Sequence, residues 1–123
     1  MMSQSKTFAP PYSQVMIVGP GSRVVVPEWA ELVPAIATDT CIAVLCRTEI
    51  DGPTTITLGL TAELDPGRPP VFTGRLKTPK KRLVLETAEG DKVMEAPTLG
   101  EETLVKVWSN QRMEPDHILI GYE

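Results

Sequence analysis

The stretch TCIAVLCRTEIDGPTTITLGLTAEL, residues 40–64, decides the fold class of this chain. Its second half places apolar side chains at every second position, the period of a strand with one buried face; these are Ile56, Leu58, Leu60, Ala62 and Leu64. Its first half does the same with Ile42, Val44 and Cys46. Asp51-Gly52-Pro53 lies between the halves and supplies turn residues, because glycine accepts positive φ and proline fixes φ. The stretch therefore predicts an antiparallel hairpin of strands 41–47 and 54–64.

Prolines divide the rest of the chain into short segments. Twelve of the 123 residues are proline, which leaves no room for long helices but suits strands. Alternation and turn signals every eight to twelve residues predict about eight strands, at 12–18, 41–47, 54–64, 71–77, 82–86, 92–95, 103–109 and 117–122. We therefore expect an all-β, single-domain antiparallel β-sandwich over residues 12–123, preceded by a flexible N-terminal tail over residues 1–11.

Two local features refine this prediction. Trp29, Leu32 and Val33 have the spacing of one helical turn, so residues 29–33 form either a short helical turn or an irregular loop anchored by the tryptophan. The last strand, 117–122, is apolar on both parities and is expected in the middle of a sheet. Loss of the final four residues should therefore impair folding.

The cysteines and the chain's hydropathy indicate a cytoplasmic location. The first seven residues are polar, and no apolar run reaches the roughly 18 residues of a membrane span. Cys41 and Cys46 lie on opposite faces of one predicted strand, about 16 Å apart at ~3.3 Å per residue, and cannot bridge each other. We expect free thiols, with Cys46 in the core.

The charges are unevenly distributed along the chain. The net charge is −4, yet residues 68–82 contain six basic and no acidic side chains. Such a segment, which includes Lys80, Lys81 and Arg82, is a candidate for contacts with phosphates. Phe72 is the one aromatic residue available there for base stacking, so a solvated turn is the preferred interpretation and nucleic acid an unlikely partner.

No pattern indicates a metal, a cofactor or a catalytic site. Asp51 and Asp65 close opposite ends of the predicted strand 54–64 and would lie about 35 Å apart at ~3.3 Å per residue, too far to share an ion. Glu89 and Asp91 are typical turn residues. The single histidine, His117, follows Asp116 and is expected to point to the opposite side of a strand, so the two do not form a dyad. No nucleophile-elbow, zinc-protease or nucleotide-binding motif occurs, and we predict a non-enzymatic protein.

Protein recognition remains as the leading hypothesis. Four loop carboxylates flank the predicted strand 103–109 and are the candidate partner-binding residues: Glu101, Glu102, Glu114 and Asp116. They suit a basic protein partner, because complementary potentials raise association rates. The strand is about 23 Å long at ~3.3 Å per residue, so the two pairs are expected at its opposite ends.

A set of ordered features resembles the small bacterial β-sandwich proteins around competence protein J, an inhibitor of a DNA-entry nuclease. These features are an opening aromatic-x-Gln-apolar strand, a following tryptophan, a central aliphatic strand and a final tryptophan-bearing hairpin, here Tyr12 to Val15, Trp29, Cys41 to Arg47, Trp108 and Ile118 to Tyr122. The resemblance implies a cytoplasmic, non-enzymatic inhibitor or immunity-type protein that binds another protein such as a nuclease or toxin. The alternative hypothesis is a structural subunit of a homo-oligomeric or larger assembly.

Overall fold

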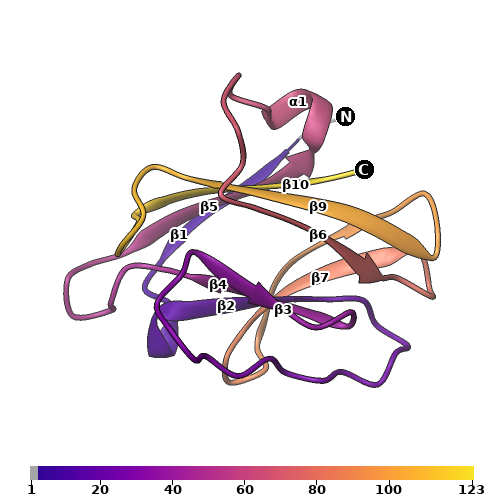
Figure 1. The fold of residues 1–123 in the computed structure, drawn as a ribbon, viewed down its shortest axis with the longest axis horizontal. Coiled ribbons are helices and arrows are strands. Elements are labelled where there is room, and N and C mark those ends of the chain that lie inside the picture. The colour runs from indigo at the N-terminus through magenta and orange to yellow at the C-terminus, as the bar shows by residue number, and fades with distance from the viewer. Residues whose placement is uncertain (1–2) are drawn as a thin grey trace.

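Two five-stranded sheets face each other in the computed structural model, which describes residues 3–123 (Figure 1). The first sheet has the order β1 (Gln4–Phe8), β5 (Thr54–Leu60), β10 (His117–Tyr122), β9 (Glu102–Ser109) and β6 (Phe72–Lys77). The second has the order β3 (Ala35–Ala37), β4 (Cys41–Leu45), β2 (Gln14–Val18), β7 (Arg82–Thr87) and β8 (Lys92–Pro97). All pairings are antiparallel except that of β5 with β10. The predicted all-β sandwich is confirmed, with ten strands in place of about eight.

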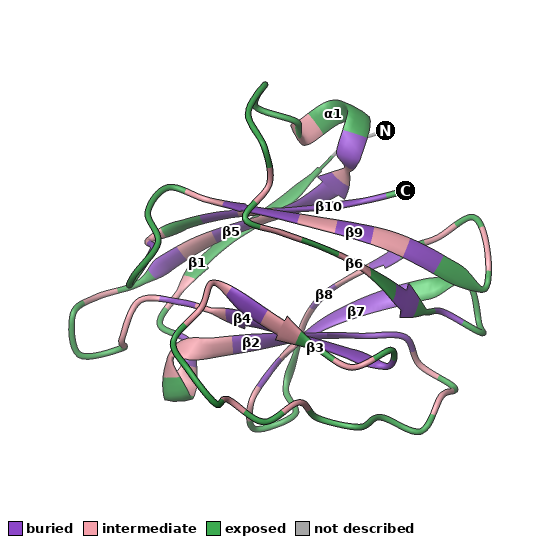
Figure 2. Ribbon diagram, in the orientation of Figure 1, coloured by how far each residue is buried: buried purple, intermediate pink, exposed green. Residues whose placement is uncertain are grey.

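The core lies between the inner faces of the two sheets, where purple bands of buried residues follow the strands in Figure 2. Alternation places every second side chain of a strand on this inner face. The largest fully buried side chains of the core cluster come from both sheets and include Ile17, Ile42, Ile56, Leu58, Leu76, Leu83, Leu85, Ile118 and Ile120. β10 lies in the middle of the first sheet, as the apolar pattern of 117–122 predicts.

The outer face of the second sheet is also covered. Met16, Val18 and Cys41 are buried there in a second cluster, against which Trp29 packs. The covering segment is the long connection between β2 and β3, which runs beneath the lower sheet in Figure 1. This connection contains no helix. Its tryptophan is anchored by a hydrogen bond, in which Trp29 Nε1 donates to Gln14 Oε1 at 2.9 Å. Of the two alternatives for residues 29–33, the irregular loop anchored by the tryptophan is the one observed.

Helical turns occur elsewhere. A 3₁₀ turn spans Pro11–Ser13, and α1 (Thr61–Leu64) follows β5 on the outer side of the first sheet. The predicted strand 54–64 therefore ends at Leu60, and Ala62 and Leu64 do not belong to it. Trp108 is buried on this outer side, and its Nε1 donates to the carbonyl oxygen of Arg68 at 2.8 Å.

The predicted hairpin of strands 41–47 and 54–64 is wrong. Both segments form strands, but β4 pairs with β2 and β3 in the second sheet, whereas β5 pairs with β1 and β10 in the first. The connecting residues 46–53 cross from one sheet to the other, because each strand needs a buried partner opposite its apolar face. The N–H of Cys46 donates to the carbonyl of Ser13, which directly precedes β2 of the second sheet. The N–H of the next residue, Arg47, donates to the carbonyl of Pro115, which lies shortly before β10 of the first sheet. β7 and β8 form an antiparallel hairpin, and β9 and β10 form the tryptophan-bearing hairpin that the resemblance implies.

β1 lies within the segment predicted as a flexible tail over residues 1–11. It pairs with β5 although its sequence, QSKTF, is polar. Besides the backbone ladder and the packing of Phe8 against the core, cross-strand hydroxyl pairs connect the two strands, with Ser5 Oγ 3.1 Å from Thr57 Oγ1 and Thr7 Oγ1 2.8 Å from Thr55 Oγ1. Apolar alternation cannot signal a strand that is held in this way.

No helix among residues 3–123 combines the length and the hydrophobicity needed to cross a lipid bilayer.

Candidate functional site

Two loops meet at one end of the sandwich because β5 and β10 are parallel neighbours. Parallel pairing aligns the starts of the two strands, with His117 opposite Thr55, so the loops that precede them, 46–53 and 110–116, become adjacent. The N–H of Arg47 donates to the carbonyl of Pro115 at 3.0 Å, and the N–H of Thr55 donates to that of Asp116 at 2.8 Å. We call these two loops together the paired-loop corner.

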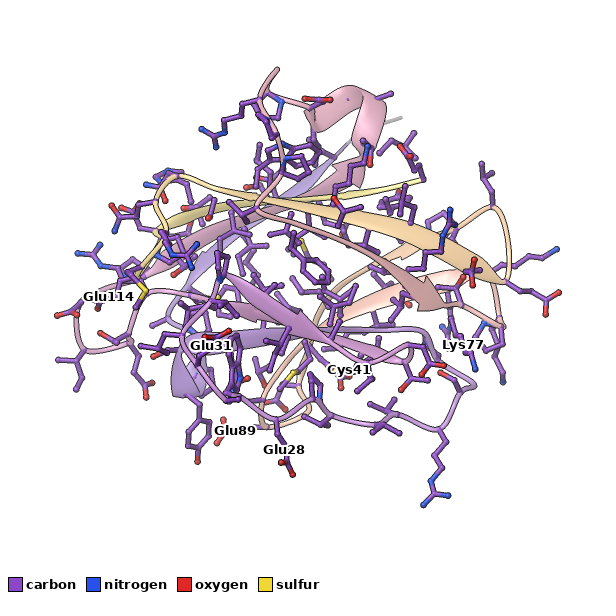
Figure 3. The ribbon with its side chains drawn as sticks, in the orientation of Figure 1. Glu28, Glu31, Cys41, Lys77, Glu89 and Glu114 are labelled. Atoms are coloured by element: carbon purple, nitrogen blue, oxygen red, sulfur yellow. The ribbon has the colours of Figure 1, made fainter. Side chains whose placement is uncertain are left out.

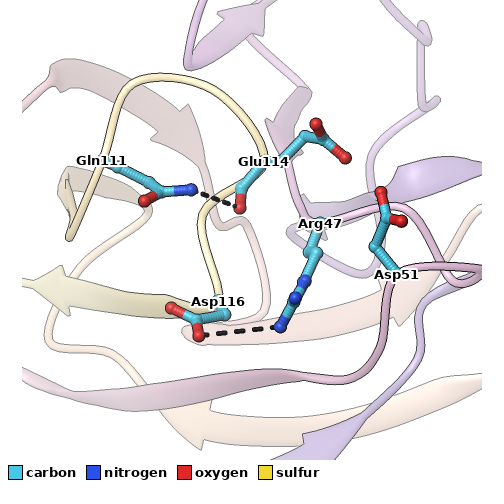
Figure 4. Close-up of a pocket in the computed structure, with 5 residues that line it drawn as sticks. All are labelled: Arg47, Asp51, Gln111, Glu114 and Asp116. Atoms are coloured by element: carbon cyan, nitrogen blue, oxygen red, sulfur yellow. Dashed lines mark hydrogen bonds and ion pairs between the residues drawn. The ribbon is translucent and has the colours of Figure 1, made fainter.

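Five polar side chains line a pocket of about 250 Å³ in this corner, namely Arg47, Asp51, Gln111, Glu114 and Asp116 (Figure 4). The guanidinium group of Arg47 lies between the carboxylates, with Nη1 3.8 Å from Asp116 Oδ2. Both side chains of this ion pair are more than a third exposed, so the pair is solvent-screened and adds little stability. The ion pair places the positive guanidinium group of Arg47 inside a pocket that otherwise contains acidic and amide side chains.

Asp51 and Glu114 form a carboxylate pair at the edge of the pocket. The Thr48 hydroxyl lies 2.6 Å from Asp51 Oδ2 and 3.4 Å from Glu114 Oε1. The hydrogen bond from Thr48 lowers the pKa of Asp51, and the hydrogen bond with Glu114 lowers it further. The hydrogen bond with Asp51 and its negative charge raise the pKa of Glu114. The two groups thus hold one proton between them more readily than two independent carboxyls would.

Hydrogen bonds to Asp116 favour its ionised form. Its Oδ1 accepts hydrogen bonds from Asn110 Nδ2 at 2.6 Å and lies 3.1 Å from His117 Nδ1. The hydrogen bond with His117, followed by that from Asn110, lowers the pKa of Asp116. The expectation that Asp116 and His117 point to opposite sides is wrong, because Asp116 precedes the first residue of β10 and is free of the strand's alternation. The His117 side chain is two-thirds exposed.

Glu101 and Glu102 lie at the other end of β9. Glu102 is opposite Lys77 in the ladder, and its carboxylate lies 3.4 Å from Arg75 Nη1. Figure 3 shows Glu114 and Lys77 at opposite ends of the molecule. The structure therefore brings Glu114 and Asp116 together and keeps both away from Glu101 and Glu102, as the length of the strand predicts.

The basic segment 68–82 is partly neutralised within the fold. Three of its six basic side chains form ion pairs with carboxylates from other elements, which are Arg75 with Glu102, Lys77 with Asp39 at 3.0 Å and Arg82 with Glu95 at 3.4 Å. Lys80 and Lys81 are exposed at the turn between β6 and β7. The segment is thus a mixed-charge surface and not a continuous cationic one.

The other candidate residues have local roles. Asp65 Oδ1 accepts from the N–H of Gly67 at 2.8 Å, as expected for a turn. No group of three or more histidine, cysteine or acidic side chains in residues 3–123 is arranged to hold a metal ion. Cys41 and Cys46 are free and buried, on the outer and inner faces respectively, and burial raises the pKa of Cys41 to about 11 and that of Cys46 to about 12.

Sequence reasoning selected Glu114 and Asp116 but missed Arg47, Asp51 and Gln111 as their neighbours. Asp51 and Glu114 are brought together by the pairing of β5 with β10. Alternation within each strand carries no information about that pairing. The sequence offered one signal of this site, namely that both loops contain acidic residues, Asp51 in the first and Glu114 with Asp116 in the second.

No family model matches the sequence, and no curated protein matches it. Among solved structures, the chain is similar to ComJ from Bacillus subtilis, described as an inhibitor of the DNA degrading activity of NucA. The TM-score is 0.68 at 12% sequence identity, and the alignment covers 97% of this chain and 93% of ComJ. The resemblance to the competence protein J proteins is therefore confirmed at the level of the fold, since both chains share one β-sandwich along almost their whole length.

Proposed function

We propose that this chain is a non-enzymatic protein-binding β-sandwich of the inhibitor or immunity type, which acts on a nuclease or toxin in the cytoplasm. The observation that carries the proposal is the similarity of fold to an inhibitor of a DNA-degrading enzyme over 97% of the chain. Two free, buried cysteines agree with a reducing compartment.

The charge distribution supports a basic protein as the partner. The chain carries a net charge of −4, and Glu114 and Asp116 lie in the acidic paired-loop corner. A surface of one sign steers a partner of the opposite sign and suppresses wrong encounters. Glu101 and Glu102 contribute less to this proposal, because Arg75 and Lys77 lie beside them.

The ion pairs of the basic segment favour a protein over a nucleic acid. Phosphate contacts require unpaired Lys and Arg side chains, and Arg75, Lys77 and Arg82 are already paired with carboxylates. A mobility-shift measurement with labelled DNA checks this point. A salt-dependent shift that is lost when Lys80, Lys81 and Arg82 become alanine would argue for nucleic-acid binding instead.

Affinity capture and an activity assay test the proposed function together. The full chain is immobilised, exposed to a lysate of its source cells at low salt, and the bound protein is identified by mass spectrometry. The purified partner is then assayed for DNA or RNA degradation with increasing amounts of the chain. Stoichiometric inhibition supports the proposal, and recovery of no protein partner contradicts it.

A structural subunit remains the second candidate, favoured by exposed apolar side chains. Val24, Val25, Val26 and Leu32 are exposed on the loop that covers the second sheet. Exposed apolar patches are common at sites of association. Analytical ultracentrifugation separates the two candidates, because a strict monomer at micromolar concentration contradicts self-assembly.

A further inference from the structure

One isoleucine at the paired-loop corner is almost wholly exposed. Ile50 lies in the loop 46–53 between Glu49 and Asp51, and 94% of its surface is accessible. Met113 of the neighbouring loop is 41% exposed and precedes Glu114. Both apolar side chains therefore stand in water next to carboxylates, although the core of the protein takes up most other large aliphatic side chains.

The loop that carries Ile50 is held by hydrogen bonds. The N–H of Asp51 donates to the carbonyl of Thr48 at 3.0 Å, and the Thr48 hydroxyl donates to the carboxylate of Asp51 at 2.6 Å. Gly52 completes the turn at φ 127°, a value that side-chain-bearing residues rarely adopt. The turn thus fixes the backbone on both sides of Ile50 while its side chain remains outside.

The neighbouring loop is fixed in the same manner. Gln111 Nε2 donates to the carbonyls of Met113 at 2.9 Å and Glu114 at 3.0 Å, and Glu114 has the left-handed φ of 47°. Strained backbone of this kind persists only where surrounding contacts hold it. Two pre-ordered loops lose little conformational entropy when a partner binds them.

Charge indicates the chemistry of the partner. The two loops carry four carboxylates against two guanidinium groups, one of which already pairs with a carboxylate; the acidic residues are Glu49, Asp51, Glu114 and Asp116. An apolar centre within a polar rim is the arrangement of a protein-binding hot spot. The acidic rim suits a partner whose own apolar pocket is bordered by Lys or Arg.

We propose that Ile50 is the apolar anchor of a docking surface for a basic protein, formed by loops 46–53 and 110–116. This inference rests on the proposed function and adds the surface and the central residue. It also assigns the docking surface to one of the two ends of the molecule. Leu99 is 90% exposed beside Glu101 at the opposite end, but there Glu102 forms an ion pair with Arg75 at 3.4 Å, which partly neutralises the acidic charge.

Site-directed photo-cross-linking locates the surface. The full chain is made with a benzophenone side chain at Glu49, beside Ile50, or at Glu101, near Leu99, and each version is irradiated in the source-cell lysate. We expect a discrete adduct with a basic protein from position 49 and none from position 101. The adduct should weaken at high salt, because screening reduces the attraction of exposed charges.

The cross-linked protein is then purified and used as the probe in titration calorimetry. Ile50→Ser should weaken its binding at least about tenfold, and the matched Leu99→Ser should leave it unchanged. Asp51→Asn and Glu114→Gln should mainly slow association, which surface plasmon resonance with the same purified protein measures. Thermal melts of Ile50→Ser and Leu99→Ser should match the wild-type melt, since these two side chains are exposed.

The outcomes separate the inference from the proposed function. Adducts from position 101 alone, or equal binding by the wild type and Ile50→Ser, overturn the Ile50 surface and leave the inhibitor proposal standing. No adduct from either position, together with an empty affinity capture, overturns both.

Discussion

The carboxyl groups of Asp51 and Glu114 share the hydroxyl of Thr48, although the two acidic residues come from loops on either side of strands β5 to β9 in the sequence. This contact joins the loops of the paired-loop corner through a pair of titrating groups. The pKa values of Asp51 and Glu114 therefore report on whether the two loops are in contact.

Carboxyl NMR should show the pKa values of the two groups shifted in opposite directions, that of Asp51 below and that of Glu114 above its ordinary range. The lowered pKa of Asp51 contributes stability that is lost as pH falls through its folded-state value. The raised pKa of Glu114 contributes stability that is lost as pH rises through its folded-state value. The corner should thus be best ordered between the two values.

Asp51→Asn tests this coupling, because it removes the group that raises the pKa of Glu114. The pKa of Glu114 should move down toward its ordinary range, while that of Asp116, which depends on His117 and Asn110, should not change. A Glu114 titration that is the same in the variant and the wild type would show that the two carboxyls do not interact.

Ile120→Ala should destabilise the protein by about 2–5 kcal/mol, because Ile120 is fully buried in the central strand β10 and the truncation leaves a cavity. Urea unfolding followed by circular dichroism measures the change. Ile50→Ala removes the same atoms from an exposed site and should stay within about 0.5 kcal/mol of the wild type. Equal effects at the two positions would contradict the burial assigned to β10.

Gly121→Ala should cost about 1–3 kcal/mol through overpacking. A Cβ at position 121 would stand 2.8 Å from Thr61 Oγ1 and 3.1 Å from a ring carbon of Trp108. Gly100→Ala is the matched control, because there the nearest atom, the carbonyl oxygen of Glu102, is at an ordinary 3.7 Å. Tryptophan fluorescence during thermal unfolding measures both. Similar melting temperatures for the two variants would contradict the close approach of Thr61, in α1, to Gly121 in β10.

Cys41 and Cys46 should both resist thiol reagents in the folded protein at pH 8. Burial shields the sulfur atoms and raises the pKa values to about 11 and about 12, so almost no thiolate is present. Ellman's reagent should therefore detect two thiols rapidly in guanidinium chloride and react far more slowly without it. Fast reaction of one thiol in the folded state would place that cysteine at the surface.

Local sequence patterns predicted most strands but not their partners. Ile42 and Ile56 both lie at apolar positions of alternating segments, and both are fully buried. The same pattern fits a hairpin or two facing sheets, because alternation indicates which face of a strand is buried but does not indicate which strand pairs with it. β1 was missed for a different reason: most of its side chains are polar, and its cross-strand hydroxyl pairs carry no hydrophobic signal.

The candidate site was predictable only in part. Charge alone singled out Glu114 and Asp116, and strand length correctly separated them from Glu101 and Glu102. The approach of Arg47 and Asp51 depends on the parallel pairing of β5 with β10, strands that lie some sixty positions apart along the chain. Only tertiary structure supplies that information.

The position of β5 between β1 and β10 also bears on how the protein reaches its native state. β5 takes one neighbour from the start of the sequence and the other from its end, so the centre of the first sheet depends on contacts of high sequence separation. Such topologies fold slowly, since distant segments must meet before their contacts stabilise them. A nascent chain that still lacks β10 exposes an apolar, unpaired edge of β5 on the ribosome, and this interval is when aggregation competes most strongly with folding.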